Sequence, residues 1–277
     1  MVGRCDNGDA ETLTHVVTLS DHRRGIELAV DAHPSPTYAI TASRLRVLAG
    51  AVDAHVVEAV PSLTGVGMVA GFTRRVVETL GAGEAAGFVV DAAIEVARLS
   101  RQVAKLPRER AERARDSAWD AWQLDRAGFS DLPDSCFTYS AAGVALFGTR
   151  TVSSMTYPDL YSPAPGQKRV FERRKTARLE RDGDRLTLSS SMHDNVHGFD
   201  VTLEIDARAE RVVRADSVIT RLPYAGICSE PQGKIHSLVG EAVDAGSSRR
   251  VQGLLGGATG CAQLYDLTTD VLKLLRA

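Results

Sequence analysis

The stretch LTGVGMVAGFTRRVVETLG, residues 63–81, decides the predicted fold because it recurs without a gap as LVGEAVDAGSSRRVQGLLG, residues 238–256. Nine of the nineteen positions are identical at an offset of 175 residues, including two adjacent arginines and three glycines. Shared helix composition in an alanine-rich chain is the alternative explanation, but glycines and paired arginines at fixed spacing argue against it. The sequence therefore predicts an internal duplication.

The same offset extends backwards into segments that are typical of β-strands. HRRGIELAVDA, from His22, aligns with HGFDVTLEIDA, from His197, and both alternate apolar and polar residues with a period of two. In the second copy, helical patterns follow at residues 247–255 and 259–275. We therefore expect an α+β fold of two small units, each an antiparallel sheet with helices, packed as a pseudo-two-fold dimer.

Three segments are expected along the chain. Residues 1–105 form the first, degenerate copy, and residues 171–277 form the second copy with the candidate site. Residues 106–170 lie between them and hold a charged connecting helix followed by a Pro- and Tyr-rich insert, which could roof an apolar pocket.

Composition narrows the classes of partner and the location. The chain has 33 basic and 35 acidic residues, which gives no electrostatic case for binding nucleic acid or an anionic membrane. Its four cysteines contain no CxxC pair, and no apolar run is long enough to span a membrane. We expect a cytoplasmic protein, a monomer or a homodimer, with a small-molecule ligand.

Chemistry-bearing side chains gather in the second copy. His193 and His197 flank a short loop, Cys228 follows a Pro-Tyr turn, and Cys261 lies at a helix start where amide groups can favour a thiolate. The predicted catalytic residues are His197, His193, Cys228 and Cys261, and the predicted substrate-binding residues are Asp194, Tyr224, Gly257 and Gln263.

Each candidate also has a structural explanation. A histidine at the start of a strand can bond a neighbouring carbonyl, and a lone cysteine can be small apolar core. The first copy serves as an internal control, because at the offset of 175 it has Asp53 and Ala86 where the second has Cys228 and Cys261. The histidine alone recurs, as His22. We therefore expect one site per chain, in the second copy, and expect Arg74, Arg75, Arg249 and Arg250 to face solvent or pair with acids.

The motifs HGFDVTLEID, LPYAGIC, LVG and LGGATGCAQL make residues 172–277 resemble the bacterial domain of unknown function 2889 family, and the first copy resembles a faded version of it. The chain departs from the family pattern at Gln263, where that pattern has His. More distantly, the order of elements is similar to the IscU/SufE-like fold. That resemblance implies a site at His197, Cys228 and Cys261 for zinc or an iron–sulfur cluster.

Two main functions follow from these observations. The first is an enzyme that acts on a small organic molecule without a cofactor, as a lyase or hydrolase, with a histidine as acid–base and a cysteine as nucleophile or binder. The second is a carrier or accessory protein that binds a metal, in which Gln263 would be a poor fourth ligand. A non-catalytic assembly module is a further alternative. We favour the enzyme.

Overall fold

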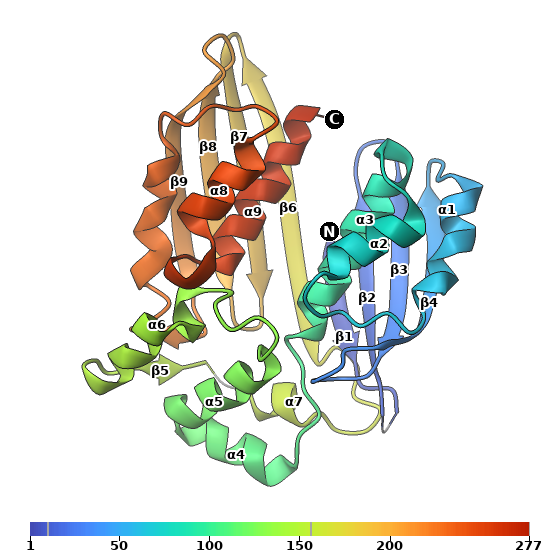
Figure 1. Cartoon of the computed structure of the whole chain (residues 1–277), viewed down its shortest axis with the longest axis vertical. Coiled ribbons are helices and arrows are strands. Elements are labelled where there is room, and N and C mark those ends of the chain that lie inside the picture. Colours follow the sequence, from blue (N-terminus) through green and yellow to red (C-terminus); the bar gives the residue numbers. More distant parts are fainter. Residues whose placement is uncertain (10, 156, 277) are drawn as a thin grey trace. The chain divides into compact units, whose positions relative to one another are not determined.

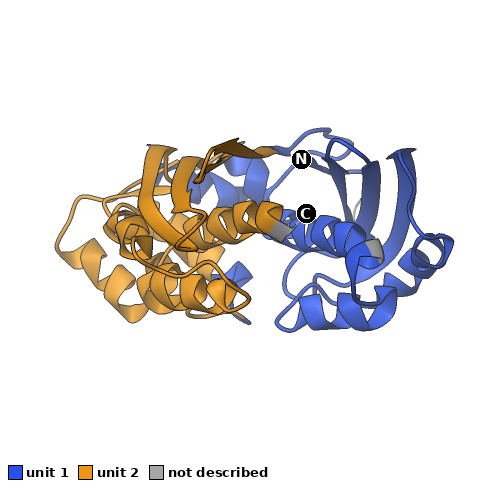
Figure 2. Cartoon of the chain, turned by 90° about the horizontal axis from the view of Figure 1, so that it is seen from above, with its two compact units in different colours: residues 1–116, 127–131, 157–173 blue, residues 117–126, 132–156, 174–277 orange. Residues whose placement is uncertain are grey.

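The structure is a computed structural model that describes residues 1–9, 11–155 and 157–276 (Figure 1). The chain divides into two compact units, coloured separately in Figure 2. Unit 1 contains residues 1–116, 127–131 and 157–173, and unit 2 contains residues 117–126, 132–156 and 174–277. Helices and antiparallel strands occur in both, so the fold is α+β, as predicted.

This division differs from the three predicted segments in its treatment of residues 106–170. They do not form a unit of their own but contribute alternately to unit 1 and unit 2. Within this segment Trp119, Trp122, Tyr139 and Phe147 make ring contacts with one another.

Unit 1 begins with four antiparallel strands in the hydrogen-bonded order β4-β3-β2-β1. Apolar residues alternate along β3, and α3 packs against the buried face of β1, β2 and β3. The elements are β1 (Val2–Asp6), β2 (Leu13–Ser20), β3 (Gly25–Ala32), β4 (Ile40–Ala49), α1 (Ala54–Ala59), η1 (Val60–Leu63), α2 (Phe72–Leu80), α3 (Glu84–Ser100), α4 (Arg108–Asp116) and α7 (Pro158–Tyr161).

Unit 2 has a second set of antiparallel strands in the order β6-β7-β8-β9, of which β6 begins in unit 1. Helices gather on one face of the strands in each unit (Figure 2). The elements are α5 (Ala118–Gly128), η2 (Phe137–Tyr139), α6 (Ala141–Ala145), η3 (Leu146–Gly148), β5 (Ser153–Ser154), β6 (Phe171–Asp182), β7 (Arg185–Asp194), β8 (Gly198–Asp206), β9 (Arg211–Arg221), β10 (Tyr224–Ala225), η4 (Glu230–Leu238), α8 (Ser247–Leu255), η5 (Gly257–Thr259), α9 (Ala262–Leu272) and η6 (Lys273–Arg276).

The predicted helices are present, with one difference in detail: the connecting helix is divided into α4 and α5. The helix over residues 247–255 lies where the sequence predicts it. The segment after Ser229 is the 3-10 helix η4, and β6 and β7 form a hairpin with its turn at Gly183. In unit 2, Leu203, Val251 and Leu267 belong to one buried core between β8, α8 and α9.

Irregular features recur in the two sheets. The β3–β4 pairing shifts register after Gly25 and again after Asp31, and the β8–β9 pairing shifts after Gly198 and after Glu204. These positions are related by an offset of 173 residues. Tyr38, two residues before β4, and Glu210, directly before β9, both have a positive φ.

The hydrogen bonds between strands therefore change one of the residue pairs that the sequence aligned, His22 with His197. The offset of 175 holds for α2 and α8, which begin and end at equivalent residues. It is 173 between β2–β3 and β7–β8, and 172 between β4 and β9. His22 is consequently not the equivalent of His197. Loops of different length between strands and helices shift the offset, which a gapless alignment cannot detect.

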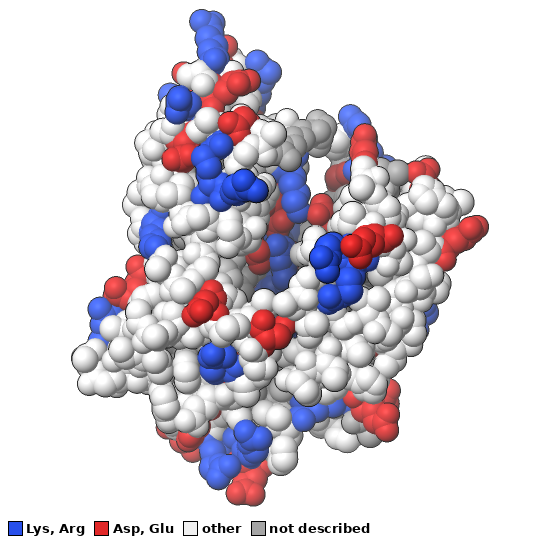
Figure 3. Space-filling model, in the orientation of Figure 1, with Lys and Arg blue, Asp and Glu red and all other residues white. Residues whose placement is uncertain are grey.

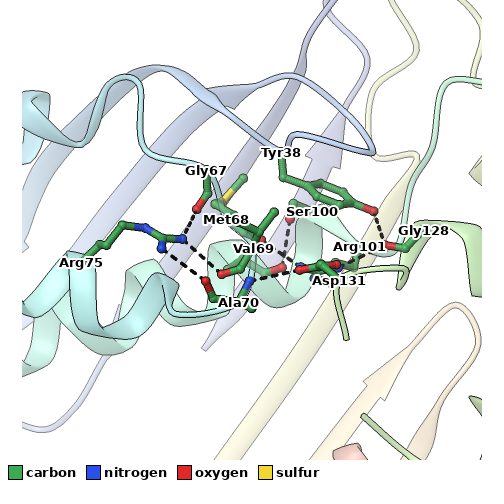
Figure 4. A network of polar contacts seen from close by, with 11 residues as sticks. Tyr38, Gly67, Met68, Val69, Ala70, Arg75, Ser100, Arg101, Gly128 and Asp131 are labelled. Atoms are coloured by element: carbon green, nitrogen blue, oxygen red, sulfur yellow. Dashed lines mark hydrogen bonds and ion pairs between the residues drawn. The ribbon is translucent and has the colours of Figure 1, made fainter. Parts of the chain in front are cut away.

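Contacts around the helices recur as well. Gly65 N–H donates to Ile40 O and Gly240 N–H to Val212 O, both at 2.8 Å. Arg75 Nη2 donates to Gly67 O at 2.8 Å (Figure 4), and Arg250 makes the equivalent bond to Ala242 O.

The sequence predicts that the repeated arginines face solvent or pair with acids, and Arg250 does pair with Glu241 and Asp244. Contacts with backbone carbonyls were not predicted. Arg75 and Arg250 bind backbone carbonyls of the loop before their helix, whereas Arg74 makes an exposed ion pair with Glu78. A planar guanidinium has several fixed donors, so one side chain can hold several carbonyls of an irregular loop.

The outer surface carries mixed charge. On the face shown in Figure 3, basic and acidic side chains are interspersed. Exposed pairs such as Arg185 with Glu204 and Arg214 with Asp216 cross or follow the strands of unit 2. None of the described helices is both long enough and apolar enough to traverse a bilayer.

Candidate functional site

The turn between β7 and β8 brings His197 onto a buried carboxylate. Asp194 Oδ1 accepts hydrogen bonds from the amides of Val196 at 2.8 Å and His197 at 2.6 Å. The turn is closed by a bond from Asp194 N–H to His197 O at 2.9 Å. The Asp194 side chain is fully buried and that of His197 is 11% exposed. The turn therefore fixes both backbone and side chain.

The imidazole of His197 is oriented by this carboxylate. Its Nδ1 lies 3.1 and 3.2 Å from the two carboxylate oxygens of Asp194. A carboxylate is an acceptor only, so Nδ1 carries the proton and Nε2 of the neutral ring is the basic atom. Within the described part of the chain, Nε2 has no hydrogen-bond partner. This arrangement can accept or donate a proton at Nε2.

Unit 1 contains the same turn with a different side chain. Asp21 Oδ1 accepts from the amides of Arg23 and Arg24 at 2.7 and 2.8 Å, and Asp21 N–H donates to Arg24 O. Arg24 Nε lies 3.2 Å from Asp21 Oδ2. Arg24 therefore stands where unit 2 has His197, and it is a permanent cation that exchanges no proton near neutral pH.

His193 does not join His197. It lies near the end of β7, and its side chain is 45% exposed, with Nε2 3.2 Å from Asp200 Oδ1. The sequence predicts a catalytic role for both histidines. The intervening turn, together with the alternation of side chains along the strand, gives them different environments.

Arg221 lies beside this turn, and Tyr224 comes three residues later in the chain. Gly198 pairs with Arg221 across β8 and β9, and Arg221 Nη1 donates to Asp194 O. Tyr224, predicted to bind substrate, is 1% exposed, and its hydroxyl donates to Asp125 Oδ2 at 2.5 Å. Asp125 belongs to α5, so the connecting segment reaches this end of the sheet.

Cys228 is a buried thiol in contact with the insert. Its Sγ lies 3.1 Å from Thr138 Oγ1, and Trp122 Nε1 donates to Thr138 O at 2.8 Å. Burial raises the pKa of Cys228 to about 12, although the bond with Thr138 lowers it. Cys228 is thus a protonated thiol at neutral pH, which disfavours the predicted role as nucleophile.

Cys261 immediately precedes α9, as the sequence predicts. Burial raises the pKa of its thiol, while the amides of Leu264 and Gln263 and the side chain of Gln232 lower it. The predicted effect of the helix start is present but is smaller than the effect of burial. Gln263 contributes here through its backbone, and Gly257 supplies a left-handed turn, with φ of 68°, before the helix.

Cys136 is a third thiol close to Cys261 that was not among the predicted site residues. Phe137 N–H donates to Gly260 O at 2.8 Å, which brings Cys136 beside Cys261. Burial, with a smaller contribution from Cys261, raises the pKa of Cys136 to about 11, against the opposing effect of hydrogen bonds from Tyr139 and Thr138. Cys136 lies in the insert, outside the repeat, so the only available signal was that it is a cysteine in a segment expected to roof a pocket.

The donor set implied for a metal does not assemble in these residues. Nδ1 of His197 is bound to Asp194, the thiol of Cys228 contacts Thr138, and Gln263 stands in place of a histidine. Among the described residues, no group of three or more His, Cys, Asp and Glu side chains is placed to hold a metal ion. The residues present thus do not fit zinc or an iron–sulfur cluster at His197, Cys228 and Cys261.

Comparison with known proteins gives one match. Residues 175–275 match the model of a family described as a protein of unknown function, DUF2889. The match supports the resemblance of the second copy to this family and includes His197, Cys228 and Cys261. No curated protein and no solved structure matches the chain.

Proposed function

We propose that the chain is an enzyme that acts on a small organic molecule by acid–base chemistry at His197, without a cofactor. The observation that carries this proposal is the oriented imidazole, with Nδ1 held by the buried Asp194 and Nε2 without a partner among the described residues. A base oriented by a buried carboxylate is the arrangement that proton transfer in lyases and hydrolases requires.

The comparison of the two turns supports a chemical role for His197. If the side chain only stabilised the turn, an arginine would serve, as Arg24 does in unit 1. The turn of unit 2 has instead an imidazole, a group that can accept and donate a proton. Its aspartate is fully buried, whereas the Asp21 side chain is 34% exposed.

The thiols are not the nucleophile that the sequence suggested. At neutral pH Cys228 and Cys136 are protonated, and a protonated thiol is a poor nucleophile. The nucleophile in a hydrolytic reaction would then be water activated by Nε2 of His197. In an elimination, Nε2 would remove the substrate proton directly.

We also infer that the two units descend from one duplicated module, of which unit 2 kept the chemistry. The paired register shifts, the positive φ at Tyr38 and Glu210, and the equivalent bonds of Arg75 and Arg250 support this inference. The pseudo-two-fold packing, the cytoplasmic location, and the monomeric or homodimeric state remain predictions.

The test compares His197→Arg with Arg24→His. Each variant gives one turn the side chain of the other, so the turn should form in both. Wild type and variants are assayed on a panel of p-nitrophenyl esters and of β-hydroxy thioesters, which cover hydrolysis and elimination. We expect turnover of at least one compound, reduced roughly 10²- to 10⁴-fold in His197→Arg and unchanged in Arg24→His.

Equal activity of wild type and His197→Arg would contradict the proposal. Metal analysis of tag-free protein distinguishes the alternative. Stoichiometric zinc or iron that is lost in Cys261→Ala, without turnover of the panel, would favour a metal carrier.

A further inference from the structure

Three segments distant in sequence meet around the sulfurs of unit 2. They are the start of η2 in the insert, the residues before and within η4, and the start of α9. The hydrogen bond from Phe137 N–H to Gly260 O joins the first segment to the third, with Cys136 and Cys261 adjacent to its two ends. Thr138 joins the first to the second through Cys228.

Gln232 supplies an unused acceptor within this cluster. Its Nε2 donates to Cys228 O at 2.6 Å, and its side chain also interacts with the thiol of Cys261. Its Oε1 is buried and, among the described residues, has no hydrogen-bond partner. A buried polar atom without a partner costs about 1–3 kcal/mol, so a donor from a bound molecule would stabilise it.

The three thiols differ in solvent exposure. Cys228 is buried and bonded to Thr138, whereas Cys136 and Cys261 are both partly exposed. Unit 1 offers no equivalent group, because the positions of Cys228, Gln232 and Cys261 there hold Asp53, Val57 and Ala86. The arrangement depends on the insert, which supplies Cys136 and Thr138 to unit 2.

We propose that Cys136 and Cys261 form a two-sulfur site for a thiophilic ligand with an oxo or hydroxo centre, of the trivalent arsenic type. Two As–S bonds form as As–O bonds break, and the two thiol protons leave with the oxygen as water. No oxidation occurs, and no other reactant is needed. A hydroxyl remaining on the centre would donate to Gln232 Oε1.

The protonation state of the thiols favours this class of ligand. Alkylating agents and peroxides react with thiolates, which burial disfavours at all three positions. A hydroxo centre carries its own proton acceptor, so it does not require a thiolate beforehand. The site is independent of the proposed acid–base chemistry at His197.

Phenylarsine oxide tests this site, because it binds two neighbouring thiols with loss of water. We expect intact-mass spectrometry of the folded protein to show one phenylarsine group per chain. Maleimide labelling of Cys136 and Cys261, which is slow because burial disfavours the thiolates, should become slower still. Cys136→Ala and Cys261→Ala should each weaken retention roughly tenfold or more, since a second attachment point is lost. Cys5→Ala, Cys228→Ala and His197→Arg should retain it.

Absence of an adduct on folded wild type, or an adduct that persists in both Cys136→Ala and Cys261→Ala, would overturn the proposal. The maleimide measurement uses wild type alone, so it decides the question even if a variant does not fold. Loss of the adduct in His197→Arg would also count against two independent sites.

Discussion

Unit 1 and unit 2 form the same backbone contacts with side chains of different chemistry. In unit 1 the side chain of the permanently charged Arg24 pairs with Asp21. In unit 2 the titratable His197 pairs with a buried aspartate, Asp194. Where unit 2 gathers thiols against the insert, unit 1 has Asp53 and Ala86. The comparison teaches that the same turns and loop contacts accommodate side chains that differ in charge and in burial.

The two units are also tied differently to the connecting segment. In unit 1, Arg101 makes a two-point ion pair with Asp131 at 2.9 and 2.8 Å and donates to Met68 O and Gly128 O (Figure 4). The guanidinium also lies 4.7 Å from the centre of the Tyr38 ring. In unit 2 the contacts with this segment are the bonds of Thr138 and the bond from Tyr224 to Asp125, together with an exposed ion pair between Arg150 and Glu230.

The largest expected effect comes from breaking the ionic tie of unit 1. Asp131→Ala leaves the guanidinium of Arg101, whose side chain is 8% exposed, without its counter-charge. We expect a loss of about 3–5 kcal/mol in the stability of unit 1, measured by hydrogen exchange of the α3 amides. Glu78→Ala, which removes an exposed partner of Arg74, is the control and should change little. A small effect of Asp131→Ala would show that the tie is dispensable.

The next largest effect comes from His15, a buried histidine at a position where unit 2 has leucine. His15 lies in β2 where β7 has Leu188, and burial lowers its pKa from 6.5 to about 4. Between these values the unfolded chain binds a proton that the native chain does not, so native stability falls as the pH drops from 6.5 to 4. The total is about 3 kcal/mol, at 1.4 kcal/mol per pKa unit.

His15→Leu gives unit 1 the residue that unit 2 has at this position, Leu188. The substitution should remove the loss of stability between pH 6.5 and 4 that comes from His15. Urea unfolding of wild type and variant at pH 7, 5 and 4 measures it as the difference between the two proteins. His22→Leu, at an exposed position, is the control. If wild type and His15→Leu lost stability in parallel over this range, the burial of a neutral His15 would be wrong.

The two aspartate turns should differ in their contribution to stability. Asp194→Ala removes a fully buried acceptor of two amide bonds and of His197 Nδ1, and we expect a loss of about 2–3 kcal/mol. Asp21→Ala removes an equivalent but 34% exposed carboxylate, and about 1 kcal/mol is expected. Hydrogen exchange in β8 and β3 reports each turn separately, and equal losses would contradict the difference in burial.

The smallest effects test the shared loop geometry. Gly65 and Gly240 have φ of 85° and 90°, with no atom near enough to contact an added Cβ. Replacing either glycine with alanine should therefore lower the free energy of unfolding by about 1 kcal/mol through backbone strain alone. The loss should be the same in both units. Gly253→Ala, in the exposed middle of α8, should stabilise by roughly 0.5–1 kcal/mol and serves as the control. Thermal unfolding measures all three, and unequal losses at Gly65 and Gly240 would break the equivalence.

Much of the local structure could be predicted from the sequence, because it depends on nearby residues. Alternation in GIELAVDA and FDVTLEIDA predicts strands, and Gly256 after an apolar stripe predicts the end of α8. The register of the repeat in the strands could not be predicted, since the loops differ in length and hydrogen bonds between strands fix the pairing. His22 was therefore aligned with His197, when Arg24 is its equivalent.

The candidate site was predictable only in part. Cys228, Cys261 and His197 were identified by residue type and by the loops that carry them. Cys136, Thr138 and Gln232 were missed, because they reach the thiols from an insert or from one turn along η4, and no pattern in the sequence records that contact.

The sequence by itself determined the elements, their order in the two units and which residue types could carry chemistry, because these follow from periodicity and from repeated glycines and arginines. The tertiary structure decided how those residues are used. Burial holds the thiols protonated, the turn at Asp194 leaves only Nε2 of His197 for proton exchange, and the insert gathers the three sulfurs. Desolvation and hydrogen-bond partners come from residues far away in the chain, so they exist only once it has folded.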